Sequence, residues 1–198
     1  MSVDSSKSTF RPVCFSTNFA NFSSVSILRQ YFMSSECLDI NYKNDYHVTF
    51  RHKITFEQSG QIEIENTFYE ISSFSKENEA CKKADCFIIF FDLESNESIR
   101  ELNKILKYIT ENCDKEKKIY LVTIYTNIEN YKNFSEDNIK SNFSHNNLDY
   151  YNILSVNMDS SEELVKTIDS IAEETLKEKN NPNKNLGIDE SISGCLII

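Results

Sequence analysis

A run of six apolar residues, Cys86 to Phe91 in "ADCFIIFFDL", is the feature of this chain that most constrains its fold. Aspartates bound the run on both sides, and its length is typical of a strand with both faces buried. Such strands occur where helices cover both faces of a parallel sheet. The run therefore predicts a buried central strand in an α/β domain.

The segments after this run alternate between helix and strand. The segment "SNESIRELNKILKYITEN" carries apolar side chains every three or four positions, which predicts an amphipathic helix, capped by Ser95 or Asn96. A second buried strand is expected from Ile119 to about Tyr125, and a third in "YYNILSV". Ser160 and Glu163 have the spacing of a capping box before a last helix. This alternation indicates a parallel sheet.

The first half of the chain adds a strand in "RPVCFST", a helix in "SSVSILRQYF" and a hairpin around Gly60. The whole pattern predicts an α/β fold, with a mostly parallel six-stranded sheet, one antiparallel edge strand and helices on both faces. We expect an N-terminal tail over residues 1–10, one domain over 11–179, and a flexible tail over 180–198.

Composition excludes several classes of protein. A formal net charge of −10 without a basic stripe argues against a nucleic-acid partner. No apolar run is long enough to span a bilayer, and the N-terminal residues do not resemble a secretory signal. The six cysteines are widely spread and are expected to be reduced. These features predict a protein of the cytosol or of a cytosolic membrane face.

The order of elements, the hairpin and the last four residues, Cys195-Leu-Ile-Ile, together resemble the Ras superfamily of small GTPases. The similarity is clearest in "ACKKADCFIIFFDLESNESIRELNKIL", and it continues through "IYLVTIYTNIENYKNFSEDNI" and "YYNILSVNMDSSEELVKTIDSIAEETL". The resemblance implies the G domain of P-loop NTPases, with a site for GTP and Mg²⁺ at the ends of the parallel strands.

The phosphate-binding motif of that family, G-x-x-x-x-G-K-[ST], is not preserved. Its counterpart is "STNFANFSSVS", where Asn21 replaces the second glycine, Phe22 replaces the lysine, and only the hydroxyl at Ser23 is kept as a metal ligand. The second switch motif has Ser72 in place of its aspartate. Thr49 is the candidate for the metal-binding threonine of the first switch, although strand propensity explains it as well.

Guanine recognition is altered too. The resemblance aligns Asn127 with the aspartate that accepts hydrogen bonds from the base, and an amide there also presents a donor. The later loop of the family corresponds to Ser155, Val156 and Asn157. The backbone N–H of Val156 could meet a base oxygen, or this segment is simply the end of a buried strand.

The last four residues fit the prenylation box, with Cys195 as the lipid acceptor. We expect geranylgeranyl rather than farnesyl, and a prenyltransferase as a partner. No polybasic patch precedes the box, and one lipid gives reversible attachment. The expected location is the cytoplasmic face of a membrane in exchange with the cytosol, with a carrier that shields the prenyl chain.

Three functions remain open from the sequence. The favoured hypothesis is a prenylated pseudo-GTPase that needs no cofactor and acts as a membrane-tethered module in signalling or vesicle traffic, binding effector proteins through the hairpin and altered loops. The first alternative is an active but divergent GTPase that uses GTP and Mg²⁺. The second is an α/β domain of receiver or flavodoxin type.

Overall fold

The computed structural model describes residues 9–17, 27, 37–44, 47–56, 60–70, 79–113, 117–125, 151–157 and 159–179. The strands are β1 (Thr9–Phe10), β2 (Pro12–Ser16), β3 (Cys37–Asn44), β4 (His47–Phe56), β5 (Gly60–Glu70), β6 (Cys86–Phe91), β7 (Lys118–Tyr125) and β8 (Tyr151–Asn157). The helices among these residues are α2 (Glu79–Lys83), α3 (Asn96–Asn112) and α6 (Ser161–Lys179).

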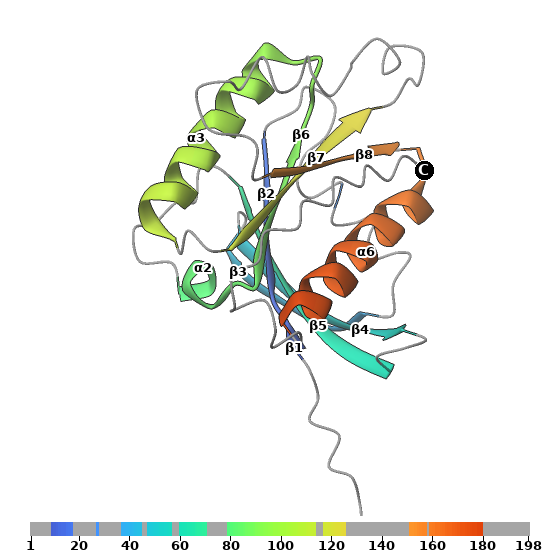
Figure 1. Ribbon diagram of the computed structural model, residues 1–198. Coiled ribbons are helices and arrows are strands. Elements are labelled where there is room, and N and C mark those ends of the chain that lie inside the picture. The colour runs from blue at the N-terminus through green and yellow to red at the C-terminus, as the bar shows by residue number, and fades with distance from the viewer. Residues whose placement is uncertain are drawn as a thin grey trace, which may run out of the picture.

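All of these strands belong to one sheet, in the order β3-β4-β5-β2-β6-β7-β8, with β1 also paired to β5 (Figure 1). The strands β5, β2, β6, β7 and β8 run parallel to one another, whereas β4 is antiparallel to both β3 and β5. The predicted α/β class is confirmed. The sheet has eight strands where six were expected, and the antiparallel strand β4 lies one position inside the edge.

The two strands beyond the expected six are β1 and β3. β1 and β2 keep the same register against β5, so they are one extended segment interrupted near Pro12, which lacks an N–H to donate. β1 begins at Thr9, inside the expected N-terminal tail. β3 pairs with β4 alone among the described strands and forms one edge of the sheet. The helix predicted in "SSVSILRQYF" lies outside the described residues, apart from helical Ile27.

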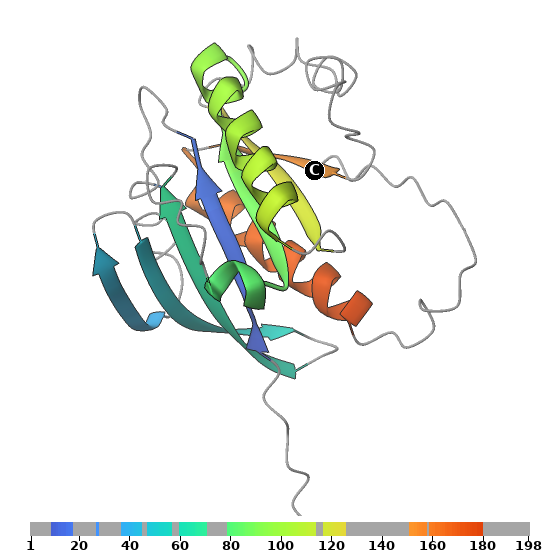
Figure 2. The same cartoon turned by 90° about the vertical axis from the view of Figure 1, so that its left-hand side faces the viewer.

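Helices cover both faces of the sheet. The helices α2 and α3 lie on one face and α6 lies on the other (Figures 1 and 2). The helices α3 and α6 pack an apolar stripe against the strands, including Leu102, Ile105 and Leu106 of α3 and Leu164, Ile168 and Ile171 of α6. The predicted amphipathic helices are therefore confirmed, and they bury the sheet on both sides.

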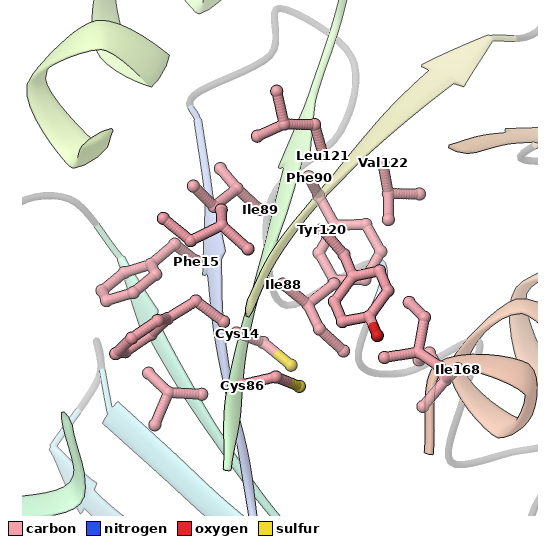
Figure 3. Close-up of a cluster of buried hydrophobic side chains, with 14 of the residues drawn as sticks. Cys14, Phe15, Cys86, Ile88, Ile89, Phe90, Tyr120, Leu121, Val122 and Ile168 are labelled. Atoms are coloured by element: carbon pink, nitrogen blue, oxygen red, sulfur yellow. The ribbon is translucent and has the colours of Figure 1, made fainter. Parts of the chain in front are cut away.

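The core is built around β6, all six of whose residues are buried. Alternate side chains of a strand point to opposite faces. On the α3 face, Phe87 stacks on Phe15 with ring centroids 6.3 Å apart, and Phe15 meets Tyr108 of α3 edge-on at 6.5 Å. On the α6 face, Ile88 and Phe90 lie near Tyr120 of β7 (Figure 3). The apolar run is thus buried from two directions, as its composition predicts.

Candidate functional site

In such a sheet, a ligand-binding site is expected at the edge where the parallel strands end. β2 continues toward the antiparallel strands on one side, while β6 continues through α3 to β7 on the other side. Neighbouring strands whose connections leave in opposite directions form a topological switch point, and open α/β sheets bind ligands there. The candidate site therefore lies between the carboxyl ends of β2 and β6.

Two buried hydroxyl groups are hydrogen-bonded to each other at this point. The side-chain oxygens of Thr17, just after β2, and Ser98, in the first turn of α3, lie 2.5 Å apart, and both residues are fully buried. Ser98 Oγ also accepts the backbone N–H of Asp92 at 2.8 Å. Thr17 donates its hydroxyl to the Phe90 carbonyl at 3.5 Å, and its backbone N–H donates to the same oxygen at 3.0 Å. In the short bond between the two hydroxyls, either oxygen can be the donor.

The start of α3 is shaped by short polar side chains. Ser95 is the N-cap, and its hydroxyl accepts the N–H of Ser98 at 3.2 Å, which confirms the first of the two predicted capping residues. Asp92 Oδ1 accepts the N–H of Glu94 at 2.8 Å and tightens the turn between β6 and α3. These bonds fix where Ser98 meets Thr17. Among the described residues, the hydroxyls of Thr17, Ser95 and Ser98 are thereby paired with protein groups.

A second set of hydrogen bonds lies between the end of β8 and the start of α6. Glu163 donates its N–H to Ser160 Oγ at 3.2 Å, as the predicted capping box requires. Its carboxylate accepts the N–H of Asn157 at 2.9 Å, because the Ser160 N–H already donates to the Asn157 carbonyl at 3.0 Å. Asn157 Oδ1 accepts the N–H of Asp159 at 2.9 Å. Both the N–H and the side-chain oxygen of Asn157 therefore have protein partners.

The described residues at this edge carry formal charges of one sign only. We use "carboxyl rim" for the described residues that end β2, β6, β7 and β8 and begin α3 and α6, namely Thr17, Phe91–Ser98, Tyr125, Asn157 and Asp159–Glu163. These residues include no lysine or arginine, and they include six acids, which are Asp92, Glu94, Glu97, Asp159, Glu162 and Glu163. Acids in first helical turns are favoured by the helix dipole. The same charges repel an anionic ligand.

The structure places the predicted nucleotide-binding residues in different surroundings. Val156 is fully buried inside β8, in register with Ile124 of β7, and Ser155 lies beside Thr123. Thr49 lies within β4, paired with Asn41 on one side and Thr67 on the other. Ser23, Asn127 and the lipid acceptor Cys195 lie outside the described residues. The described part of the chain does not bring these residues into one cluster.

The described residues of the rim offer no cationic group to a magnesium nucleotide. A triphosphate needs cationic groups and free N–H donors, whereas the hydroxyls of Thr17 and Ser98 and the N–H of Asn157 already have protein partners. In the described segments, no three carboxylate, imidazole or thiol groups gather closely enough to hold a metal ion. We therefore derive no reaction step through GTP or Mg²⁺.

Sequence reasoning missed the Thr17–Ser98 pair. One signal was available, since Ser98 stands four residues before Leu102 on the buried stripe of α3, where a hydroxyl needs a partner. The identity of that partner was not readable, because Thr17 and Ser98 are 81 positions apart in the chain. The missed pair is the one that joins the two sides of the switch point.

Comparison with known proteins agrees with the topology. The family model described as Ras family matches residues 41–176, more than two thirds of the chain. None of the curated proteins matches the sequence. The matched region runs from β3 almost to the end of α6, and its strand and helix order is the one described above. The chain belongs to the Ras family and is a small GTPase-like protein.

Proposed function

We propose that this protein is a pseudo-GTPase, a Ras-family member that does not cycle between nucleotide states and serves as a binding module. The observation that carries the proposal is the carboxyl rim, whose described residues include six acids and no lysine or arginine. Each unit charge placed near a triphosphate of the same sign costs binding energy, and the cost is larger away from bulk water.

The substitutions in the binding motifs act in the same direction. Phe22 stands for the lysine, Asn127 for the base-binding aspartate and Ser72 for the aspartate of the second switch. Each lost charge-assisted hydrogen bond is worth roughly 1.5–3 kcal/mol, so the three together remove on the order of 4.5–9 kcal/mol if they add. That corresponds to a loss of roughly a thousandfold to a millionfold in affinity. The family match also begins at residue 41, after the segment that should hold the phosphates.

The active-GTPase alternative depends on Ser23, Asn127 and the backbone near Val156. The burial of Val156 within β8 favours the interpretation of this segment as a strand end. Membership of the Ras family removes the support for a receiver or flavodoxin type of domain. The choice therefore lies between a nucleotide-free and a nucleotide-binding member of one family.

Purification without added nucleotide separates these two functions. The protein is denatured, and the supernatant is analysed by chromatography for guanine nucleotides, with a fluorescent GTP analogue and Mg²⁺ titrated in parallel. We expect no stoichiometric nucleotide and no saturable fluorescence change. Release of one guanine nucleotide per chain would establish the active GTPase instead.

Partner binding is proposed at the antiparallel side of the sheet and the altered loops. Effector proteins dock on the hairpin region in the family that the sequence resembles, and here β3 extends that region to three strands. The outer edge of β3 pairs with no other described strand. An effector would therefore meet β3 first, rather than the strand that follows it.

Membrane tethering is proposed through a geranylgeranyl group on Cys195, added by a prenyltransferase. None of the helices described here is long and apolar enough to cross a bilayer. A single lipid binds membranes reversibly, and a net charge of −10 adds no attraction to anionic leaflets. We propose exchange between a cytoplasmic membrane face and the cytosol, with a carrier protein shielding the lipid.

Membrane fractionation tests the anchor independently of nucleotide binding. Cys195→Ser should move the protein from the membrane fraction to the soluble fraction, while Cys113→Ser, a change at a half-buried cysteine, should leave the distribution unchanged. Equal partitioning of wild type and Cys195→Ser would refute the lipid anchor without affecting the pseudo-GTPase proposal.

A further inference from the structure

Two cysteines from separate elements meet at the edge of the sheet opposite the carboxyl rim. Cys81 belongs to α2, which precedes β6, and Cys113 is the C-cap of α3, which precedes β7. Because β6 and β7 are parallel, both residues lie near the amino ends of these strands. The two thiols share a side-chain hydrogen bond. Both are free thiols in the structure.

The surroundings of the two thiols differ. Cys81 is only 2% exposed, and its pKa is raised by the hydrogen bond with Cys113 and by burial. Cys113 is half-buried, and its pKa is lowered by the hydrogen bond with Cys81 and by the nearby ammonium of Lys117. Lys117 is held in place because its Nζ donates to the Ala84 carbonyl, directly after α2. Cys113 is therefore the thiol that ionises first.

We propose that Cys81 and Cys113 are a reactive dithiol, which peroxides oxidise to a disulfide that joins α2 to the end of α3. The juxtaposition supplies both parts that such a reaction needs, a partly exposed thiolate and a second thiol within reach. Thiolates, not thiols, are the attacking species.

The reaction has two balanced steps. The Cys113 thiolate attacks one oxygen of hydrogen peroxide, so an S–O bond forms, the O–O bond breaks, and the departing hydroxide takes a proton to become water. The product is a sulfenic acid on Cys113. Cys81 then attacks that sulfur, the S–S bond forms, the S–O bond breaks, and hydroxide leaves with the proton of Cys81 as a second water. Two thiols are oxidised and one peroxide is reduced.

A second pair of cysteines in the same molecule provides a contrast. Cys14 of β2 and Cys86 of β6 face one another under α6, and both are fully buried (Figure 3). Burial raises the pKa of both thiols, and neither side chain has exposed surface. Proximity of two sulfur atoms is shared by both pairs, whereas ionisation and access belong to the Cys81–Cys113 pair. We therefore expect the Cys14–Cys86 pair to remain reduced under conditions that oxidise the other.

Peptide mapping of the full chain tests the proposal. The folded protein is treated with hydrogen peroxide in the presence of a metal chelator, free thiols are alkylated, and the chain is digested without reduction. We expect one intramolecular linkage between the peptides of Cys81 and Cys113, with Cys14 and Cys86 alkylated only after unfolding. The oxidised protein should also unfold at a higher urea concentration, since the cross-link constrains the unfolded chain.

Single serine variants establish the order of the two steps. Cys81→Ser should leave a sulfenic acid on Cys113 that a dimedone reagent traps, and Cys113→Ser should abolish both the linkage and dimedone labelling of Cys81. Cys14→Ser is the matched control and should form the linkage as wild type does. A wild-type chain in which Cys81 and Cys113 stay alkylatable, or in which Cys14 and Cys86 cross-link equally, would overturn the proposal. None of these outcomes depends on nucleotide binding.

Discussion

The hydroxyl groups of Thr17 and Ser98 lie 2.5 Å apart and connect the end of β2 to the first turn of α3 across the switch point of the sheet. Both residues are fully buried, so neither hydroxyl can exchange this bond for water. In an α/β sheet this is the position where a ligand usually enters. In this protein, Thr17 and Ser98 are bonded to each other at this position.

Removing one hydroxyl should therefore lower stability. Ser98→Ala leaves the part-buried Asp92 N–H without its acceptor, and such a loss costs about 1–3 kcal/mol. Urea unfolding at neutral pH measures the change. Ser170→Ala, which removes an exposed hydroxyl bonded to its own helix, is the matched control and should change the free energy of unfolding by less than about 0.5 kcal/mol. An equal effect of the two changes would contradict the inferred role of the pair.

The carboxyl group of Asp169 on α6 should make stability depend on pH. Its Oδ1 atom is buried without a hydrogen-bond partner in the structure, and burial raises its pKa from 3.8 to about 6. The folded state then keeps this proton to a higher pH than the unfolded state does. This contribution to stability is consequently full below about pH 4 and is lost as pH rises through about 6.

Asp169→Asn tests this dependence. The variant should be more stable than wild type above pH 6, because it removes a buried charge, and the difference should shrink as the pH approaches 4. The midpoint of urea unfolding, measured at several pH values for both proteins, gives the answer. A difference that stays constant from pH 4 to pH 8 would show that Asp169 titrates normally.

Asp85 should be important for holding the amino edge of the sheet. Its Oδ2 accepts the Arg11 N–H at 2.8 Å between β1 and β2, and its Oδ1 accepts from Lys179 Nζ at 2.7 Å at the end of α6. Asp85→Ala should cost about 1.5–3 kcal/mol, because it removes two charge-assisted bonds from a side chain that is 13% exposed. Lys179→Met should cost less than about 1 kcal/mol, since that lysine is exposed. Thermal or urea unfolding distinguishes the two, and the reverse ranking would contradict this assignment.

The parts of the fold that were predictable from the sequence are those set by local pattern. The apolar run of β6 and the amphipathic helices α3 and α6 have their signals within their own residues. β3 was not predicted, because "CLDINYKN" lacks a continuous apolar run and forms a strand by pairing with β4. A strand that forms through backbone pairing with another segment is only weakly indicated by its own side chains.

In the candidate site, too, the features set by local sequence were predictable and those set by the path of the chain were not. The capping box of Ser160 and Glu163 was predicted from its spacing, and the bond between Glu163 N–H and Ser160 Oγ confirms it. The carboxylate of Glu163 reaches Asn157 instead of Ser160, because the turn after β8 had already used the Ser160 N–H. Such competition for a donor is decided by the path of the chain, which spacing alone does not specify. The acidic rim likewise depends on which strand ends meet.

The final prediction concerns ligand binding and follows from linkage. A ligand that binds only the folded state stabilises it by RT ln(1 + [L]/Kd), so 1 mM nucleotide with a Kd of about 1 μM would add about 4 kcal/mol. An acidic rim with no base should hold GTP far more weakly. We expect 1 mM GTP with Mg²⁺ to raise the free energy of unfolding by less than about 0.4 kcal/mol, which places Kd above about 1 mM.

Separate arms of this experiment assign the cause of any stabilisation. Mg²⁺ alone controls for weak cation binding to the six acids, and ATP with Mg²⁺ controls for binding of phosphate without selection of guanine. Stabilisation by GTP but not by ATP would require a working guanine site, and the pseudo-GTPase proposal would then be wrong. Equal small effects in all three arms would reflect cation screening of the rim, because the rim carries only negative formal charges among its described residues.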